Sequence, residues 1–458
     1  MTAGPSNPRD LALAALCDRA GNVTAHLDRL LSEQAVEPAA AGLAWELAMG
    51  VVRRRGTLDA VIDAFCQRAA PTPRRVREVL RLGAYQVLFL DRIPVFAAVD
   101  EAVKQVGVRG GRAMRGFVNA VLRNIDRAAS PVQQGPPELA GDVLPVAPDR
   151  FRRFDRAVFP DPTADPSGYL AAACSLPPEL AGRWLKRFRG GLAGAMGPAL
   201  HANARPPIVL RVNALRATVE QVLRRLAAEG IDAVAHANGA SVVLTGHADI
   251  KRLDVLAEGL VQPQDPSATA VVAAAPIEPG MNVLDLCAAP GTKTTHLAER
   301  MANRGRIVAA DVSDEKLARV RDNCRRMGVE IVETIPADRV AALEADSFDV
   351  VLVDAPCSNT GVLARRPEAR WRFDPRQVES LARDQQLLLA LGAEFVRPGG
   401  ALVYSTCSME PQENEQVVRA FGRQHGHFSL RRQVRTAPAG ATDPAHWSDG
   451  GAFAILRR

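Results

Sequence analysis

Two cysteines in the second half of the chain each follow directly on a short apolar run. Cys357 comes after Phe348–Val353, within the segment DAPCS, and Cys407 comes after Gly400–Ser405. Such runs are typical of buried strands, and the carboxyl ends of parallel strands share one edge of a sheet. We therefore expect both thiols at one edge, beside the carboxylate of Asp354. Each cysteine alone could instead be a buried structural residue, the usual fate of a free cysteine.

Two thiols beside a carboxylate suit the methylation of carbon 5 of cytosine. That carbon is too weak a nucleophile to take a methyl group from a sulfonium. Addition of a thiolate at carbon 6 turns the ring into an enamine; after methyl transfer a base removes the carbon 5 proton and the thiolate leaves. A carboxylate such as that of Asp354 can hold the N3 and amine edge of the ring. Methylation of an exocyclic amine needs no thiol, and the spacing does not decide which cysteine attacks.

A turn of small residues lies between an expected strand, Asn282–Leu286, and an expected helix, Thr294–Met301. This arrangement holds nucleotide-like ligands at the carboxyl edge of a sheet. The turn has only one glycine, so it lacks the dinucleotide fingerprint, and no P-loop is present. A ligand with an adenosine but no phosphates fits better. The residues of the turn are Cys287, Ala288, Ala289, Pro290, Gly291, Thr292 and Lys293.

Two acids follow the next apolar runs. Asp311 comes after Arg306–Ala310, at the spacing of an acid that accepts hydrogen bonds from ribose hydroxyls. It could instead cap the helix that begins near Ser313, a common role for aspartate. Taken with the preceding turn, we interpret Asp311 as a ribose ligand. Asp338 follows Glu330–Ile335 and could meet an adenine amine, or could be an ordinary acid of a surface loop.

The elements that must position these residues alternate in type along residues 261–458. Alternation of short apolar runs with helical stretches predicts βαβ units, that is, a parallel sheet with helices on both faces. The expected strands are 282–286, 306–310, 348–353 and 400–405, and the expected helices are 294–301, 315–327 and 378–396.

The first part of the chain, residues 1–128, carries only helical periodicity from about residue 9 onward. It is also dense in arginine, and these side chains either cover solvated helix faces or form a phosphate-binding surface. The arginines in question are Arg53, Arg54, Arg55, Arg74, Arg75, Arg77, Arg109, Arg112 and Arg115.

Two further segments separate the helical part from the predicted sheet. Residues 129–166 contain eight prolines and no apolar periodicity, which predicts a flexible or semi-extended linker. Residues 167–260 read as a small α+β unit. Its expected elements are helices 179–188 and 219–229 and strands 208–212 and 241–244.

Composition places few limits on function. The chain has 458 residues, is 47% hydrophobic, and carries 57 Lys and Arg against 51 acids, for a net charge of +6. This mild excess permits a polyanionic partner without requiring one. Seven cysteines without a CxxC pair indicate neither a disulfide framework nor a zinc site. No signal peptide or apolar run of about 20 residues is evident, so we expect a cytoplasmic protein with reduced thiols and no membrane partner.

Taken together, these motifs resemble those of the RsmB (Sun, Fmu) family of bacterial 16S rRNA cytosine-C5 methyltransferases. The resemblance covers nearly the whole chain. It is carried by LDLCAAPG (284–291), DAPCS (354–358) and STCS (405–408), with support from QDPS (264–267) and EN (413–414). The segment VNAVLRN (118–124) resembles the NusB-type RNA-binding domain of this family, which single-domain relatives lack.

The resemblance implies a multi-domain fold. Residues 1–128 would form a NusB-like all-α domain, 167–260 an α+β RNA-recognition subdomain, and 261–458 a Rossmann-like class I methyltransferase domain. The methyl donor would be S-adenosylmethionine, held by 287–293 with Asp311, Asp338 and Asp354. The partner would be 16S rRNA, free or in an early assembly intermediate, and the enzyme a monomer. An unpaired or flipped base is needed to reach the cytosine.

The resemblance also implies a role for each thiol. In RNA enzymes of this superfamily the cysteine of the Thr-Cys motif attacks, which makes Cys407 the nucleophile, and Cys357 assists release of the adduct. In DNA cytosine-C5 enzymes the Pro-Cys residue attacks instead. The chain departs from the family pattern at Thr292, where a second glycine is usual, and we expect strain there if the position needs a positive φ. Asp338 follows Pro-Ala instead of the usual glycine.

Three other functions compete with this interpretation. One is cytosine-C5 methylation of another RNA, either tRNA or 23S rRNA. Another is a non-catalytic RNA-binding assembly factor, which would have no need of two thiols at one edge. The third is a methyltransferase for protein or DNA, which the Thr-Cys motif and the helical N-terminal part disfavour.

Overall fold

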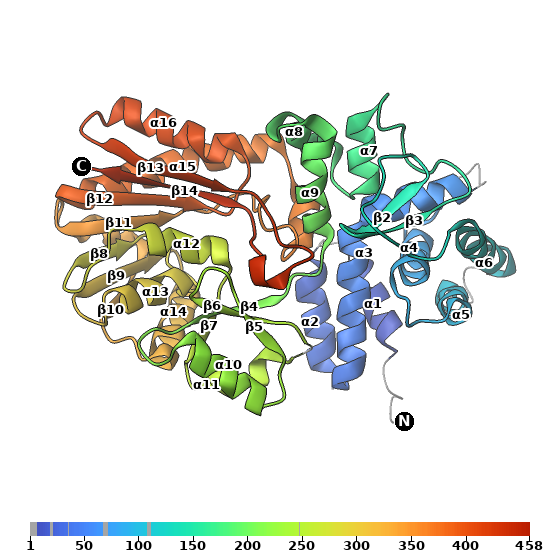
Figure 1. Ribbon diagram of the computed structural model, residues 1–458, viewed down its shortest axis with the longest axis horizontal. Coiled ribbons are helices and arrows are strands. Elements are labelled where there is room, and N and C mark those ends of the chain that lie inside the picture. The colour runs from blue at the N-terminus through green and yellow to red at the C-terminus, as the bar shows by residue number, and fades with distance from the viewer. Residues whose placement is uncertain (1–6, 19–21, 35, 67–71, 108–110, 247) are drawn as a thin grey trace. The chain divides into compact units, whose positions relative to one another are not determined.

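The computed structural model describes residues 7–18, 22–34, 36–66, 72–107, 111–246 and 248–458 (Figure 1). Arg109, one of the arginines considered above, lies outside these ranges. The chain forms two compact units, one of Met1–Ala204 with Arg366–Arg372, the other of Arg205–Arg365 with Phe373–Arg458. No helix among the described residues is long and apolar enough to cross a bilayer.

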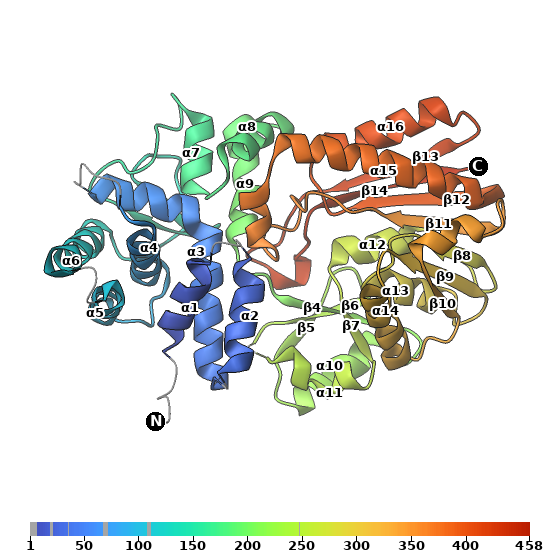
Figure 2. The ribbon, with the colours of Figure 1, turned by 180° about the vertical axis from the view of Figure 1, so that it is seen from behind.

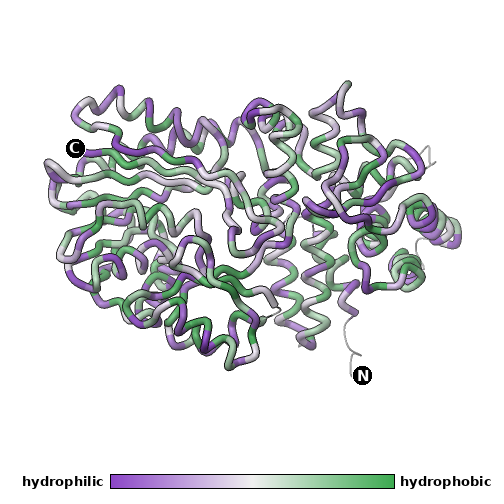
Figure 3. Tube along the Cα trace, in the orientation of Figure 1, coloured by the Kyte–Doolittle hydropathy of each residue, from purple (hydrophilic) through white to green (hydrophobic). Residues whose placement is uncertain are grey.

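The first unit begins with helices alone, which confirms the expected all-α character of this part. Asn7 and Asn22 accept backbone N–H groups and so cap the first two helices. Figure 3 shows apolar and polar residues intermixed along these helices, and most of the apolar ones are buried. The helices are α1 Pro8–Leu16, α2 Val23–Glu33, α3 Pro38–Phe65, α4 Arg74–Phe89, α5 Val95–Val106 and α6 Gly111–Ala128.

Most of the arginine clusters in these helices have structural partners. Arg54 is buried, and its guanidinium donates to the carbonyl oxygens of Pro145, at 2.9 Å, and Val146, at 2.5 Å. Arg77 pairs with Asp59 and Asp63. Neither arginine is therefore available as part of a phosphate-binding surface.

The linker expected at 129–166 is instead partly a small sheet, ordered β1-β3-β2. Val143, Leu144 and Phe151 are buried, so the segment has its own apolar contacts. Pro145 lies within β2, which is an edge strand, where a proline costs no ladder hydrogen bond. The many prolines concealed this sheet in the sequence. The strands are β1 Gln133–Gln134, β2 Val143–Ala147 and β3 Arg150–Arg153.

Three helices complete the first unit, together with a short segment from far along the chain. The 3-10 helix η4 (Pro367–Arg372) packs in this unit through Arg370, which is fully buried. Its guanidinium donates to the carbonyl oxygens of Ala202 and Ser175 and to Oδ1 of Asn203. The expected α+β segment from residue 167 is thus divided, because its first helices belong here and its later elements belong to the second unit. They are α7 Pro166–Ala173, α8 Pro178–Arg187 and α9 Gly191–Asn203.

The second unit begins with a four-stranded antiparallel sheet, ordered β5-β6-β4-β7 and packed against α10. The strands expected at 208–212 and 241–244 are confirmed, as is the helix near 219–229. The elements are β4 Ile208–Val212, α10 Val219–Ala228, β5 Ala233–Ala235, β6 Ser241–Leu244, η2 Ile250–Arg252, α11 Asp254–Ala257 and β7 Val261–Pro263.

The larger sheet, whose residues are all described, has seven strands in the order β10-β9-β8-β11-β12-β14-β13. The first five are parallel, as predicted, and β14 and β13 add an antiparallel edge that was not foreseen. The strands are β8 Asn282–Asp285, β9 Arg306–Asp311, β10 Val332–Pro336, β11 Phe348–Asp354, β12 Val396–Thr406, β13 Ser429–Thr436 and β14 Gly451–Arg457.

Helices cover both faces of this sheet, as Figures 1 and 2 show. Alternate residues of each strand point to opposite faces, so Val351 and Val353 pack under α15 and α16, while Val350 and Leu352 pack with α12, α13 and α14. The helices are α12 Pro266–Ala274, α13 Thr292–Arg300, α14 Asp314–Met327, α15 Pro375–Phe395 and α16 Glu415–Gln424, with η3 Ala337–Ala342, η5 Pro411–Glu413 and η6 Pro444–His446.

Candidate active site

The two cysteines predicted to share an edge are brought together. Strands β11 and β12 are parallel neighbours, with Asp354 in register with Ser405, so the loops that follow them leave the sheet side by side. The Sγ atoms of Cys357 and Cys407 are 3.1 Å apart, and both thiols are free and partly exposed. A reacting group can therefore reach both sulfur atoms.

Asp354 lies at the end of β11, and both of its carboxylate oxygens are engaged. Oδ2 accepts from Lys293 Nζ at 2.6 Å, and Oδ1 accepts from Ser405 Oγ at 2.6 Å. Burial lowers the pKa of Lys293, but the charge and hydrogen bond of Asp354 outweigh this effect and leave the pKa above its ordinary value. Lys293 is therefore a cation at neutral pH and fixes the position of the Asp354 side chain beside the thiols.

Asn359 is a site residue that the sequence analysis missed. It has a φ of +60°, a conformation that asparagine tolerates, and its Nδ2 donates to the carbonyl oxygen of Cys357 at 2.8 Å. Its Oδ1 accepts from Cys407 Sγ at 3.3 Å. The Cys357 loop thereby folds back over the other thiol, and the N–H of Gly361 donates to the carbonyl oxygen of Cys407 at 2.9 Å. In the sequence, the feature that could have indicated this role is an asparagine two residues after Cys357.

Cys357 is held in its protonated form. The largest effect on the pKa of the Cys357 thiol is its hydrogen bond with Cys407. Burial comes next, followed by the electrostatic effects of Cys407 and of Glu413. Together these raise the pKa of Cys357 well above its ordinary value. Cys357 is therefore suited to give a proton during a reaction, and poorly suited to carry a resting negative charge.

The turn from β8 into α13 has the form expected of a cofactor loop. Gly291 has a φ of +96°, and a Cβ there would lie 3.1 Å from the Cα of Val320, so glycine is required. Thr292 is instead the first residue of α13, and its φ is not positive. The strain expected at Thr292 is therefore absent. Cys287, also in this turn, is partly buried, and burial raises the pKa of its thiol to about 12.

Asp311 lies at the end of β9, next to this turn. Its Oδ2 accepts the backbone N–H of Ala289 at 3.0 Å, and Lys316 Nζ lies 3.4 Å from Oδ1. The N-cap of α14 is Ser313, so the alternative that Asp311 caps this helix is wrong. Asp338 lies in η3, just beyond β10 on the same edge of the sheet, and is exposed.

Asp285, at the end of β8, is a second residue that the sequence analysis missed. It is buried, and Oδ2 accepts from Thr294 Oγ1 at 2.7 Å. Burial raises its pKa to about 7, and the nearby charges of Asp354 and Asp311 contribute in the same direction. Asp285, Asp311 and Asp354 thus lie along this edge, where Lys293 pairs with Asp354 and Lys316 lies near Asp311. That set fits a ligand that carries positive charge and no phosphate.

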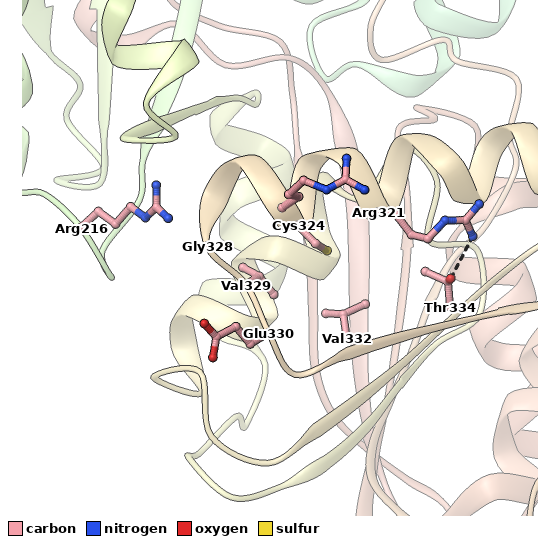
Figure 4. A pocket seen from close by; sticks show the side chains of 9 residues that line it. Arg216, Arg321, Cys324, Gly328, Val329, Glu330, Val332 and Thr334 are labelled. Carbon is pink, nitrogen blue, oxygen red and sulfur yellow. Dashed lines mark hydrogen bonds between the residues drawn. The ribbon is translucent and has the colours of Figure 1, made fainter.

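A separate pocket of about 520 Å³ lies beside α14 and β10 (Figure 4). Arg321 donates to Thr334 Oγ1 at 3.0 Å across it, and the buried Cys324 lies on its wall. None of the residues predicted for catalysis or cofactor binding lines this pocket. The carboxyl edge of the sheet therefore remains the candidate active site.

Comparison with known proteins identifies the families of three parts of the chain. Residues 272–444 match the family described as 16S rRNA methyltransferase RsmB/F. Residues 6–127 match the NusB family, and residues 197–251 match the RsmF/B-like ferredoxin-like domain. The NusB match covers helices α1–α6, and the ferredoxin-like match includes β4, α10, β5 and β6.

Individual relatives extend over almost the whole chain. The probable ribosomal RNA small subunit methyltransferase B of Bacillus subtilis (strain 168) is 32% identical over 92% of this chain and 89% of its own length. Ribosomal RNA small subunit methyltransferase B of Enterobacter sp. (strain 638) is 31% identical over 92% and 91%. The crystal structure of a methyltransferase homolog protein from Pyrococcus horikoshii is 27% identical with a TM-score of 0.53, covering 63% of this chain and 97% of that one. The chain therefore belongs to the RsmB/F family of S-adenosylmethionine-dependent rRNA methyltransferases.

Proposed function

We propose that this protein methylates carbon 5 of one specific cytosine in 16S rRNA, with Cys407 as the covalent nucleophile. The observation that carries the proposal is the 3.1 Å separation of the Cys357 and Cys407 sulfur atoms beside Asp354. A methyl transfer to nitrogen or to ribose has no use for two such thiols. Cytosine-C5 chemistry needs one thiol to activate the ring and a second group to resolve the adduct.

The chain's own residues have defined tasks in this reaction. The thiolate of Cys407 adds to carbon 6, and the electron pair displaced from the 5,6 double bond makes carbon 5 nucleophilic. Asp354 holds the N3 and amine edge of the ring, with Lys293 and Ser405 fixing its orientation. S-adenosylmethionine, when bound, supplies an electrophilic methyl group. A base takes the carbon 5 proton, the electron pair of that C–H bond restores the 5,6 double bond, and the bond from carbon 6 to sulfur breaks so that Cys407 leaves as a thiolate. Cys357 assists this release, because its proton lies beside the departing sulfur.

The cofactor would be held along the carboxyl edge of the sheet. We assign the turn Cys287–Lys293 to its adenosine and methionine portions, Asp311 to the ribose hydroxyls, and Asp354 to the wall of its pocket. Asp338 would meet the adenine amine. The carboxylates of this edge and the single glycine of the turn support a phosphate-free, positively charged ligand.

RNA binding is proposed for residues 1–128 and for the α+β region within 167–260. In the first, a groove of about 570 Å³ lies between α5 and α6 and is lined by Arg112, Arg115 and Arg123. None of these three guanidinium groups forms an ion pair within the described part of the chain. Phe96, at the same groove, is 67% exposed. Free arginines beside an exposed aromatic ring suit the backbone and a base of single-stranded RNA.

The proposed partner is 16S rRNA, free or in an early assembly intermediate, and the proposed enzyme is a cytoplasmic monomer. Bisulfite sequencing of ribosomal RNA from a deletion strain and its parent tests the substrate directly. One 16S cytosine should lose protection in the deletion strain and regain it on complementation. If the 16S pattern is unchanged and a protected cytosine is lost in tRNA or 23S rRNA, that RNA is the substrate and the assignment to 16S rRNA is wrong. No change in any RNA would favour an assembly factor.

A further inference from the structure

Glu413, the last residue of η5, is a fully buried carboxylate outside the roles described so far. Its Oε1 accepts the backbone N–H of Ser358 at 2.8 Å, and its Oε2 accepts Ser358 Oγ at 2.5 Å. Ser408 Oγ also donates to Oε2. Ser358 directly follows Cys357 and Ser408 directly follows Cys407, so one carboxylate holds the residue after each thiol.

Glu413 is itself held in place from two sides. Gln385 Nε2, on α15, donates to Oε1 at 3.1 Å and to the carbonyl oxygen of Pro356 at 2.8 Å. Tyr404 OH, on β12, donates to the Glu413 carbonyl oxygen at 2.5 Å. The two carboxylate oxygens thus accept from Ser358, Gln385 and Ser408, which fixes the carboxylate between the two loops.

We propose that Glu413 is a positioning residue that joins the two cysteine loops and, through its negative charge, keeps the proton of the thiol pair on Cys357. This inference rests on the proposed function. Two sulfur atoms 3.1 Å apart cannot both be ionised, because like charges at that distance repel strongly. Glu413 accepts the backbone N–H next to Cys357 and makes two of its hydrogen bonds to Ser358 and one to Ser408, so a further negative charge is less favourable on Cys357 and Cys407 is left as the nucleophile.

The charged groups around the thiol pair also favour a proton on Cys357. Glu413 contributes to the raised pKa of Cys357, after the hydrogen bond with Cys407 and burial. Lys293, a cation, interacts electrostatically with Cys407. Among the described residues, Tyr404 and Glu413 interact with Cys357, and Asp285 and Asp354 act on Lys293.

Alkylation of the full-length protein by iodoacetamide, without RNA or cofactor, tests this inference. Peptide mass spectrometry would follow labelling of Cys357 and Cys407 from pH 6 to pH 10. In the native protein Cys407 should react faster at every pH. Glu413→Gln removes the charge, and should reduce the preference for Cys407 by about tenfold, the equivalent of one pKa unit. Glu415→Gln, which neutralises a neighbouring carboxylate that pairs with Arg435, should leave the preference unchanged.

Two further measurements separate the effect of the Glu413 charge from the effect of its position between the loops. Glu413→Asp keeps the charge and shortens the side chain, so labelling should retain its preference while kcat falls and KM changes little. An unchanged preference in a folded Glu413→Gln protein would overturn the inference, as would faster labelling of Cys357 in the native protein, which needs no variant. Failure of the proposed function is distinguishable, because labelling requires no RNA: a protein that does not methylate cytosine would still show the preference for Cys407.

Discussion

The Sγ atoms of Cys357 and Cys407 lie 3.1 Å apart, although 50 residues separate them in the chain. Adjacent parallel strands bring them to one edge, and Asn359, Gly361 and the Glu413 carboxylate bring the two loops together beyond it. In the proposed mechanism one sulfur atom attacks the pyrimidine ring while the other stays beside the same ring. The first three predictions concern the residues of this edge.

Cys407→Ala should abolish methyl transfer, with kcat reduced by more than about a thousandfold, because the nucleophile of a covalent mechanism is removed. Cofactor affinity should stay within about twofold, since the turn at 287–293 is untouched. Methyl incorporation into 16S rRNA and calorimetric titration with S-adenosylmethionine measure the two quantities. A variant that keeps substantial activity would rule out Cys407 as the nucleophile.

Cys357→Ala should allow attack and slow release, so a covalent protein–RNA complex should accumulate. The complex should migrate slowly on denaturing gels and disappear in the double variant Cys357→Ala, Cys407→Ala. Rapid turnover without a trapped complex would argue against a release role for Cys357.

Asp311→Ala should weaken S-adenosylmethionine binding by about 10–100-fold, because a hydrogen-bonded carboxylate is lost from the ribose position. Asp338→Ala is the matched comparison at the same edge, and its effect should be smaller because Asp338 is exposed. Calorimetry on the two variants gives both values. Equal affinities for the native protein and the Asp311→Ala variant would remove Asp311 from the site.

Much of this edge could be predicted from the sequence, because strand ends in a parallel sheet converge whatever the details of the loops. That reasoning brought Asp354, Cys357 and Cys407 together. It did not find Asn359 or Glu413, because their contacts depend on a positive φ and on a short 3-10 helix, which leave no periodic signal. The strands within residues 129–166 were missed for a different reason: prolines at an edge strand look the same in a sequence as prolines in a linker.

Asp285 gives a prediction about stability and pH. Burial raises its pKa from 3.8 to about 7, so between these values the folded state binds a proton that the unfolded chain does not. The proton on Asp285 therefore contributes its full stabilisation of the folded protein below about pH 4, and this contribution is lost as the pH rises through about 7. Asp285→Asn cannot titrate, so its unfolding free energy should rise relative to the native protein across this range, by at most about 4 kcal/mol. Urea unfolding from pH 5 to pH 8 measures the difference; parallel curves would contradict the assignment.

The α5–α6 groove gives a prediction about salt. Replacing Arg112, Arg115 and Arg123 together by glutamine should weaken binding of single-stranded 16S rRNA fragments. It should also reduce the slope of log K against log salt by about 2, at about 0.7 for each phosphate that is no longer neutralised. Arg306→Gln, which changes an exposed arginine at the start of β9 that pairs with Glu333, serves as a control for general charge. An unchanged slope in the triple variant would mean that these arginines are ordinary surface residues.

The most direct test of the central claim uses 16S rRNA labelled with tritium at carbon 5 of cytosine. Methylation at carbon 5 must expel that hydrogen, so the account predicts one tritium released to water for each methyl group incorporated. Incorporation of methyl groups without release of tritium would contradict it, because the methyl group would then have gone to nitrogen or to ribose.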